Sequence, residues 1–162
     1  MGTVLGTAAV EYDRKYATQA PSYGTETRGS PTMSQVVISS TSIGYPGVRQ
    51  TDILVAMTQT ALNQHSKNLS KEAIVFVDPD LVKSVPSNVG KVGRIPATKL
   101  SEESLGSRNY ANTVMLGALI KSTRLVSIEG ARNAIRATVP RGTIESNLRA
   151  FELGVRAIQN SR

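Results

Sequence analysis

The polar side chains most able to do chemistry gather between residues 18 and 31, in the stretch TQAPSYGTETRGSP. Tyr23-Gly24 can place an aromatic ring beside a permissive turn, since glycine tolerates positive φ. Glu26 and Arg28 carry opposite charges two positions apart, and Gly29 lets the backbone approach another molecule closely. The stretch is too long for a simple turn, and its density of polar groups favours a contact loop over an ordinary surface loop.

The other titratable side chains are weaker candidates for chemistry. His65 lies in a polar stretch, LNQHSKN, with no nucleophile or metal ligand near it in sequence, so we interpret it as a surface histidine. Asp78 and Asp80 flank Pro79 after an apolar run, where open α/β sheets often bind ligands. Asp-Pro-Asp is also typical of a turn that begins a helix, and we favour that structural interpretation. We also predict that Glu102-Glu103 lie at the start of a helix, where acidic side chains are favourable.

A basic surplus marks the C-terminal third. The chain carries 19 Lys+Arg and 12 Asp+Glu, a formal net charge of +7, and from Arg108 onward nine basic residues accompany three acidic ones. Glu145/Arg149 and Glu152/Arg156 have the spacing of helical ion pairs, which indicates a solvated charged face. Four other arginines have fewer local partners and are candidates to bind a phosphate-bearing ligand or an acidic partner: Arg124, Arg132, Arg136 and Arg141.

The composition excludes several kinds of site. Without cysteine, the chain cannot form disulfides, hold a metal or an iron–sulfur cluster through thiolates, or use a cysteine nucleophile, and one histidine excludes a histidine-rich metal site. Neither GxGxxG nor GxxxxGK[ST] occurs, so no glycine-rich phosphate loop is predicted. No apolar run approaches the roughly 20 residues that span a bilayer, and the first residues lack a signal-peptide pattern, so we expect a cytoplasmic protein.

The elements that would position these residues alternate between strands and helices. Apolar residues at helical spacing predict a helix over 2–13, and residues 58–69 are long enough for another. Short apolar and β-branched runs predict four strands, at 33–39, 53–57, 74–77 and 92–95. The middle two runs are continuously apolar, as in parallel strands that helices cover on both faces.

The last third is predicted to be helical. Residues 114–120 form an apolar helix with small residues for close packing, and Ser127 is a candidate N-cap for the next helix. The final helix carries one apolar stripe, made of Ile144, Leu148, Phe151, Val155 and Ile158. This order of elements predicts an α/β fold, with a mostly parallel sheet flanked by helices and a helical C-terminal third, in a single domain over residues 1–162.

Five stretches then form an ordered set: Lys15–Pro31, TDILVAM (Thr51–Met57), IPAT (Ile95–Thr98), NTVMLGAL (Asn112–Leu119) and NLRAFELG (Asn147–Gly154). In this order they resemble five motifs of the gamma subunits of 2-oxoacid:ferredoxin oxidoreductases. Those motifs are a TQxxSYGPExRGG loop, a DxLVA strand, an I/V-P-A-T turn, an NxVxLGAL helix and a closing NxxAFxxG. The resemblance covers nearly the whole chain.

Three departures from the family pattern are visible. Family members begin with a strand and a glycine-rich GxGGQG loop, which do not precede the helix predicted over 2–13, and Thr25 and Ser30 replace a proline and a glycine. We therefore expect the first strand of the family fold to be missing and the true N-terminus to lie upstream. Loss of that strand would expose backbone donors and apolar surface.

The resemblance implies a subunit of a multisubunit enzyme that is not active alone. Such enzymes decarboxylate a 2-oxoacid on thiamine diphosphate, pass electrons through iron–sulfur clusters to ferredoxin, and release acyl-CoA. The complex is expected to use thiamine diphosphate, Mg, iron–sulfur clusters and CoA, none of them bound by this chain alone. Its partners would be alpha and beta subunits and, where present, a ferredoxin-like delta subunit, with ferredoxin contacted indirectly. The TQAPSYG sequence favours 2-oxoglutarate over pyruvate and branched-chain 2-oxoacids.

The resemblance also implies which part of this chain contributes to the thiamine/CoA cleft of the enzyme. The loop is expected to face a partner subunit near the thiamine/CoA cleft, and no catalytic residue or metal ligand is expected in this chain. The predicted cofactor- or partner-binding residues are Thr18, Ser22, Tyr23, Gly24, Glu26, Arg28 and Gly29. The C-terminal arginines are candidates to assist the CoA phosphates electrostatically.

Two alternatives stay open. A basic α/β nucleic-acid-binding domain would need the +7 charge to form one exposed patch, and its binding would fall steeply with salt. Aromatic residues make up only 4% of the chain, with no tryptophan, which counts against base stacking. A self-sufficient enzyme would need a nucleophile, a base and an orienting group, and no such set is visible in the sequence.

Overall fold

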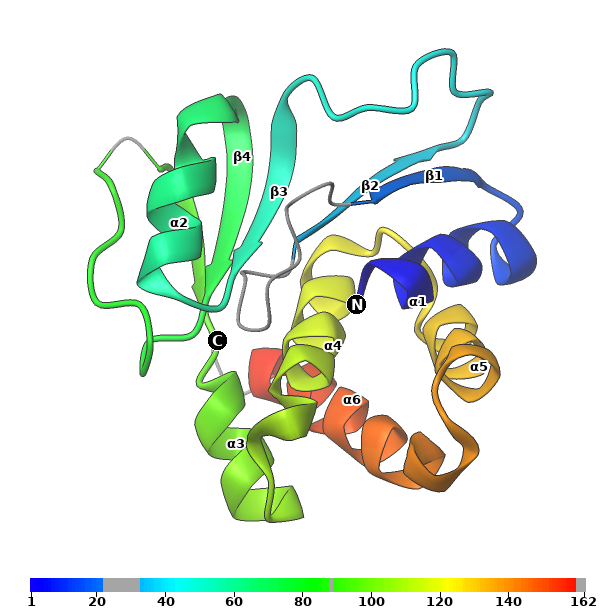
Figure 1. Ribbon diagram of the computed structural model, residues 1–162, viewed down its shortest axis with the longest axis vertical. Coiled ribbons are helices and arrows are strands. Elements are labelled where there is room, and N and C mark those ends of the chain that lie inside the picture. Colours follow the sequence, from blue (N-terminus) through cyan, green and yellow to red (C-terminus); the bar gives the residue numbers. More distant parts are fainter. Residues whose placement is uncertain (22–32, 88, 160–162) are drawn as a thin grey trace. The chain divides into compact units, whose positions relative to one another are not determined.

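The computed structural model describes residues 1–21, 33–87 and 89–159, and the chain divides into two compact units. Unit 1 comprises Met1–Val48 and Arg124–Ile144, and unit 2 comprises Arg49–Thr123 and Glu145–Arg162. Helices and strands occur in the mixed order expected of an α/β protein (Figure 1). The α/β prediction is confirmed, whereas the single domain over residues 1–162 stays a prediction.

Unit 1 places helices beside a two-stranded hairpin. Helix α1 (Gly2–Thr7) continues as a π-helical stretch (Ala8–Tyr12), which confirms the helix predicted over 2–13. Strands β1 (Tyr16–Pro21) and β2 (Ser34–Ser39) pair antiparallel in a continuous register from Tyr16↔Ser39 to Pro21↔Ser34. Helix α5 (Ile128–Thr138) packs against α1, and α1 also contacts both strands.

The hairpin corrects part of the sequence prediction. Residues 18–21 belong to β1 and not to the predicted loop, because they pair with β2 along their whole length. The strand predicted over 33–39 is present, but it pairs antiparallel with its neighbour. Ala20 and Pro21 have low strand propensity, and the cross-strand pairing overrides that preference.

Two long-range contacts join the separated segments of unit 1. The Asp13 carboxylate accepts hydrogen bonds from the Ser127 amide at 2.5 Å and from the Ser127 hydroxyl at 2.6 Å. Lys15 Nζ donates to the Leu125 carbonyl at 2.6 Å. Ser127 Oγ in turn accepts from the amide of Gly130 at 2.9 Å, which confirms Ser127 as the N-cap of α5.

Unit 2 contains a parallel sheet in the order β3-β4-β5. Its strands are β3 (Thr51–Ala56), β4 (Leu69–Val77) and β5 (Lys91–Arg94). Helix α2 (Gln59–His65) and a 3₁₀ turn (Ser66–Asn68) connect β3 to β4. A core cluster consists of Ala56, Leu62, Val75, Val77 and Val82. The predicted parallel pairing is confirmed, but only β4 is largely buried, over its last half, whereas β3 is mostly half-buried.

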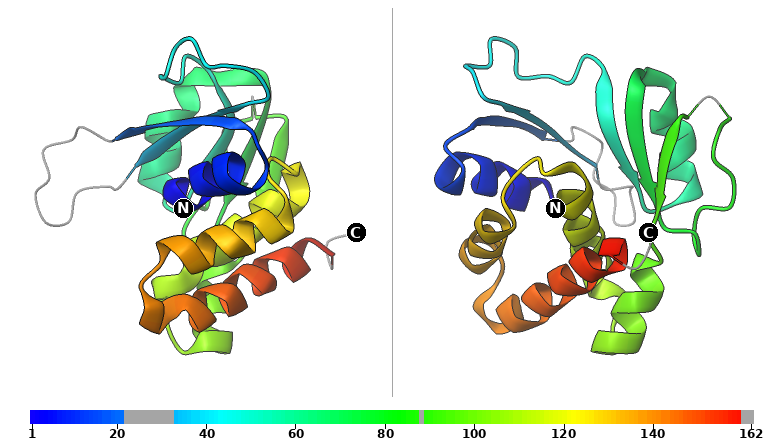
Figure 2. Two further views of the ribbon diagram at one scale, coloured as in Figure 1. Left: turned by 90° about the vertical axis from the view of Figure 1, so that its right-hand side faces the viewer. Right: turned by 180° about the vertical axis from the view of Figure 1, so that it is seen from behind.

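The remaining helices of unit 2 follow the sheet. They are α3 (Ala97–Leu105), a 3₁₀ turn (Arg108–Tyr110), α4 (Ala111–Thr123) and α6 (Ile144–Gln159), which starts at the last residue of unit 1. Figure 2 shows α4 and α6 running past one another. Every residue from Thr113 to Ile120 is buried, which matches the uniformly apolar sequence of α4. None of the described helices is long and apolar enough to cross a membrane.

Helices α4 and α6 touch backbone to backbone through glycine. A Cβ on Gly154 would lie 1.8 Å from the Val114 carbonyl oxygen, and a Cβ on Gly117 would lie 2.1 Å from the Phe151 carbonyl oxygen. No side chain fits at these distances, because the obstructing atoms are backbone and cannot rotate away. The small residues predicted for close packing in α4 therefore set the distance between the two helices.

We expect Gly154→Ala to lower the free energy of unfolding by about 3 kcal/mol, because the added methyl group forces α4 and α6 apart. Urea unfolding of the full chain, followed by far-UV circular dichroism, measures this change. Gly6→Ala is the matched control: Gly6 is also helical, but a Cβ there meets nothing within 4 Å. The control should change stability by less than about 1 kcal/mol, in the stabilising direction. Equal effects of the two substitutions would contradict this packing argument.

Candidate functional site

The base of the predicted contact loop is the hairpin of unit 1. Thr18 lies in β1, where its hydroxyl donates to the Pro46 carbonyl at 3.1 Å. Gln19 Nε2 donates to Ser34 Oγ at 3.0 Å, diagonally across the hairpin, since Val36 is the residue opposite Gln19. The other predicted binding residues lie outside the described residues and stay predictions: Ser22, Tyr23, Gly24, Glu26, Arg28 and Gly29.

The first turn of α1 reaches the same end of the hairpin. A Cβ on Gly2 would lie 2.0 Å from Ser34 Oγ, so the helix backbone contacts the serine directly. Burial lowers the pKa of the Met1 amino group below its ordinary value of 8.0, because desolvation penalises the charged form. Sequence reasoning missed Gln19 and Ser34. The available signal was the pair of strand-like runs on either side of a glycine- and proline-containing stretch, which predicts a hairpin.

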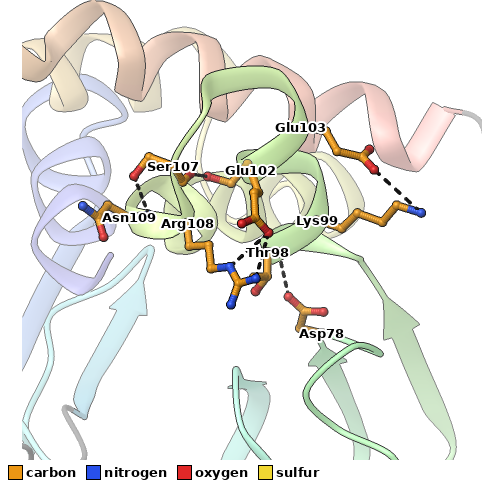
Figure 3. Close-up of polar contacts among 9 residues, drawn as sticks. Asp78, Thr98, Lys99, Glu102, Glu103, Ser107, Arg108 and Asn109 are labelled. Carbon is orange, nitrogen blue, oxygen red and sulfur yellow. Dashed lines mark hydrogen bonds and ion pairs between the residues drawn. The ribbon is translucent and has the colours of Figure 1, made fainter.

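Asp78 is fully buried at the carboxyl end of β4 (Figure 3). Its Oδ2 accepts from the Thr98 amide at 2.7 Å, in the first turn of α3, and its Oδ1 accepts from the Asp80 amide at 3.0 Å. The Asp78 carbonyl also accepts from the amide of Val82 at 2.8 Å. The carboxylate therefore caps α3 from the end of a strand. The turn predicted at Asp78-Pro79-Asp80 is confirmed, but the helix start predicted there is wrong, because no helix lies between β4 and β5 in the described residues.

The acidic residues of α3 form ion pairs with nearby basic side chains. Glu102 Oε2 lies 3.0 Å from Arg108 Nη2, and Glu103 Oε1 lies 3.9 Å from Lys99 Nζ (Figure 3). The prediction that Glu102-Glu103 lie at the start of a helix is wrong, because α3 begins at Ala97 and has no acidic residue in its first turn. Each of these exposed pairs contributes a few tenths of a kcal/mol to about 1 kcal/mol to the free energy of unfolding.

The arginines of α5 also have partners. Arg132 Nη1 lies 3.0 Å from Glu129 Oε2, and Arg136 Nη1 lies 3.9 Å from Glu129 Oε1 and donates to Asn133 Oδ1 at 2.8 Å. The prediction that Arg132 and Arg136 have fewer local partners is therefore wrong, because one helical face brings both within reach of Glu129. Arg124 and Arg141 are exposed. In unit 2, Arg149 donates to the Ser104 carbonyl at 3.4 Å.

The described part of the chain contains no recognisable metal site. His65 is the half-buried last residue of α2. Among residues 1–21, 33–87 and 89–159, no group of three or more His, Asp or Glu side chains could hold a metal ion. The hairpin of unit 1, which contains Thr18, is the part of the predicted contact site that the structure describes, and its role in binding stays a prediction.

Comparison with known proteins gives one consistent result. Residues 1–157 match the family described as pyruvate ferredoxin/flavodoxin oxidoreductase. The 2-oxoglutarate synthase subunit KorC of Methanothermobacter thermautotrophicus is 44% identical over 159 residues, which cover 94% of this chain and 84% of that subunit.

Solved structures give the same fold. The keto/oxoacid ferredoxin oxidoreductase gamma subunit of Geobacter sulfurreducens superposes with a TM-score of 0.86 at 33% identity, over 99% of this chain and 90% of that one. A 2-oxoglutarate:ferredoxin oxidoreductase of Magnetococcus marinus, solved with 2-oxoglutarate, coenzyme A and succinyl-CoA bound, superposes with a TM-score of 0.78 at 18% identity. This match covers 99% of this chain and 28% of that one, and it supports the fold alone.

We expect Asp78→Ala to lower the free energy of unfolding by about 2 kcal/mol, because it leaves two partly buried amides without their charged acceptor. Asp78→Asn should cost less, since its amide oxygen still accepts one of the two bonds. Thermal or urea unfolding of the full chain measures both changes. Asp80→Ala is the control, because Asp80 is exposed, and it should shift stability by less than about 0.5 kcal/mol. An Asp78→Ala protein as stable as this control would contradict the capping role.

Proposed function

The chain belongs to the pyruvate ferredoxin/flavodoxin oxidoreductase family and is a gamma-type subunit of a 2-oxoacid:ferredoxin oxidoreductase, and from this premise we propose that its enzyme acts on 2-oxoglutarate. The observation that carries the choice of substrate is the 44% identity, over 94% of the chain, with a 2-oxoglutarate synthase subunit. The enzyme would decarboxylate 2-oxoglutarate, join the succinyl group to CoA, and pass the two electrons released to ferredoxin.

In this proposal the chain contributes to assembly and to the CoA/thiamine cleft. It has no cysteine and therefore no thiolate for an iron–sulfur cluster, and among its described residues no group of three or more His, Asp or Glu side chains could hold a metal ion. Those groups, with thiamine diphosphate, would belong to alpha and beta subunits and to a ferredoxin-like delta subunit where one is present. Ferredoxin would meet the complex through these partners, in the cytoplasm.

The loop between β1 and β2 is the part of the chain that we assign to this cleft. Tyr23, Glu26 and Arg28 would face the partner subunit, with Thr18 holding the base of the loop through the Pro46 carbonyl. The formal net charge of +7 has the sign that attracts polyanionic CoA. Arg124 and Arg141, which are exposed, are the arginines best placed to add to this attraction.

We expect a tagged chain, purified from its native host, to bring down the other subunits of the oxidoreductase, identified by mass spectrometry. The purified complex should reduce viologen in a CoA-dependent reaction, with a higher kcat/KM for 2-oxoglutarate than for pyruvate or a branched-chain 2-oxoacid. A faster reaction with pyruvate would overturn the choice of substrate. A chain recovered alone, or with nuclease-sensitive nucleic acid, would overturn the oxidoreductase assignment.

We expect Glu26→Ala and Arg28→Ala each to raise the apparent KM for CoA about tenfold or to weaken subunit assembly, because each removes a charged contact in the cleft. Steady-state kinetics and size-exclusion chromatography of the assembled complex measure these effects. Glu72→Ala and Lys91→Ala remove the same charges from an exposed pair in unit 2, 3.6 Å apart, and serve as controls. Values for the loop variants that match those of the controls would contradict the assignment of the loop.

A further inference from the structure

Exposed aromatic and apolar side chains gather where the first helical segment of unit 1 leads into β1. Among the described residues six large apolar or aromatic side chains are exposed, and three of them lie within seven residues: Val10, Tyr12 and Tyr16. The Lys15 amide donates to the Ala9 carbonyl at 2.8 Å, so the chain folds back at the end of the helix and keeps these side chains in one region. A concentration of exposed apolar side chains is typical of an interaction surface.

Two arginines of unit 1 adopt a backbone conformation that favours glycine. The φ angle is 53° at Arg14 and 54° at Arg124, and in the described part of the chain these are the two residues other than glycine with a positive φ. Each directly follows a helical segment, at the position where glycine commonly ends a helix. Any side chain with a Cβ lowers stability in this conformation. Glycine would therefore suit the backbone better, and the reason for arginine lies in its side chain.

The two arginines lie on adjoining segments. Lys15 Nζ donates to the Leu125 carbonyl at 2.6 Å, and each arginine is next in sequence to one of these two residues. The hydrogen bonds from Ser127 to the Asp13 carboxylate join the same two segments. Arg14 and Arg124 therefore extend from backbone that is held in place on both sides.

Both guanidinium groups are available to another molecule. Arg14 and Arg124 are exposed, and neither side chain forms an ion pair or a hydrogen bond with another described residue. The acids nearby do not neutralise them: Asp13 bonds to the N-cap of α5, and Glu129 pairs with arginines of α5 itself. Glu11 is exposed and lies within 4 Å of neither guanidinium.

The chemistry of this surface favours a protein partner that carries carboxylates. Arginine and tyrosine are among the residue types that contribute most to binding at protein interfaces, and a guanidinium can bind a carboxylate through two parallel hydrogen bonds. The formal net charge of +7 complements an acidic partner. We propose that Arg14 and Arg124, with Tyr12 and Tyr16, form a docking surface for a carboxylate-bearing face of another subunit of the oxidoreductase. This inference rests on the proposed function, in which the chain assembles with other subunits.

Arg14→Gly and Arg124→Gly test the surface, because each removes a charge and also relieves the backbone. Each variant should raise the Kd of the full chain for the other subunits about tenfold, the effect of one lost hydrogen bond between charged groups. The free energy of unfolding of the same variants should stay equal or rise, so weaker binding cannot be attributed to a damaged fold. Biolayer interferometry measures the Kd, and urea unfolding of the full chain measures stability.

Salt and two further variants sharpen the test. Raising the NaCl concentration should weaken binding of the unsubstituted chain more than binding of the glycine variants, because the lost contacts are ionic. Tyr16→Ala should raise the Kd about tenfold and leave the salt dependence unchanged. Arg94→Ala is the matched control, since Arg94 is an exposed arginine in β5 of unit 2, and its Kd should equal that of the unsubstituted chain.

The outcomes separate this inference from the proposal on which it rests. If the chain binds the other subunits and the glycine variants have the same Kd as Arg94→Ala, the docking surface is overturned and the oxidoreductase assignment stands. If the unsubstituted chain binds no other subunit, the proposed function fails. Glycine variants that assemble normally but raise the KM for CoA would show that the arginines bind the cofactor, and would overturn the docking surface. A chain that dimerises alone through these arginines would overturn the choice of partner.

Discussion

The direct backbone contact between α4 and α6 is the constraint on which the helical part of unit 2 depends. Gly154 and Gly117 each face a carbonyl oxygen of the other helix at a distance that leaves no room for a side chain. Because the helices lie so close, Val114 and Phe151 are completely buried. Helix α3 covers another side of α4, which is why α4 has no polar face along most of its length. The polar exception, Thr113, is satisfied by the Asn147 side-chain oxygen at 2.9 Å.

In both units, a carboxylate that lies far away in the sequence caps the N-terminus of a helix. Asp78 accepts from the first turn of α3, and Asp13 accepts from the amide and hydroxyl of Ser127, which itself caps α5. In each case a negative charge lies at the positive end of a helix and satisfies amides that the helix leaves without partners. A carboxylate held in this way has its oxygens occupied, so neither residue is prepared for acid–base chemistry or metal binding. This use of its acids agrees with a gamma-type subunit that acts through contacts with other subunits.

The features that were predicted best from the sequence are the helices and strands that follow from local hydrophobic periodicity. The buried strands β3 and β4, the apolar stripe of α6 and the Ser127 cap all follow from patterns within about 15 residues. The sequence did not predict the features that depend on contacts between residues far apart in the chain. Ala20 and Pro21 have low strand propensity and lie in a strand because β2 pairs with them. The contact between Asp13 and Ser127 spans 114 positions. Of the predicted binding residues, only Thr18 is described. Its contact with Pro46 and the Gln19–Ser34 bond could not be predicted, because side-chain partners across a hairpin require the register first.

The contacts of unit 1 form a continuous series that ends at the hairpin. Asp13 and Lys15 fix the end of the first helical segment to the start of α5, through Ser127 and Leu125. The first turn of the same segment meets Ser34, so a single helical segment connects α5 to the end of the hairpin. A change at Asp13 would therefore reach the hairpin only by moving or loosening α1, whereas a change at Ser34 acts on the hairpin directly.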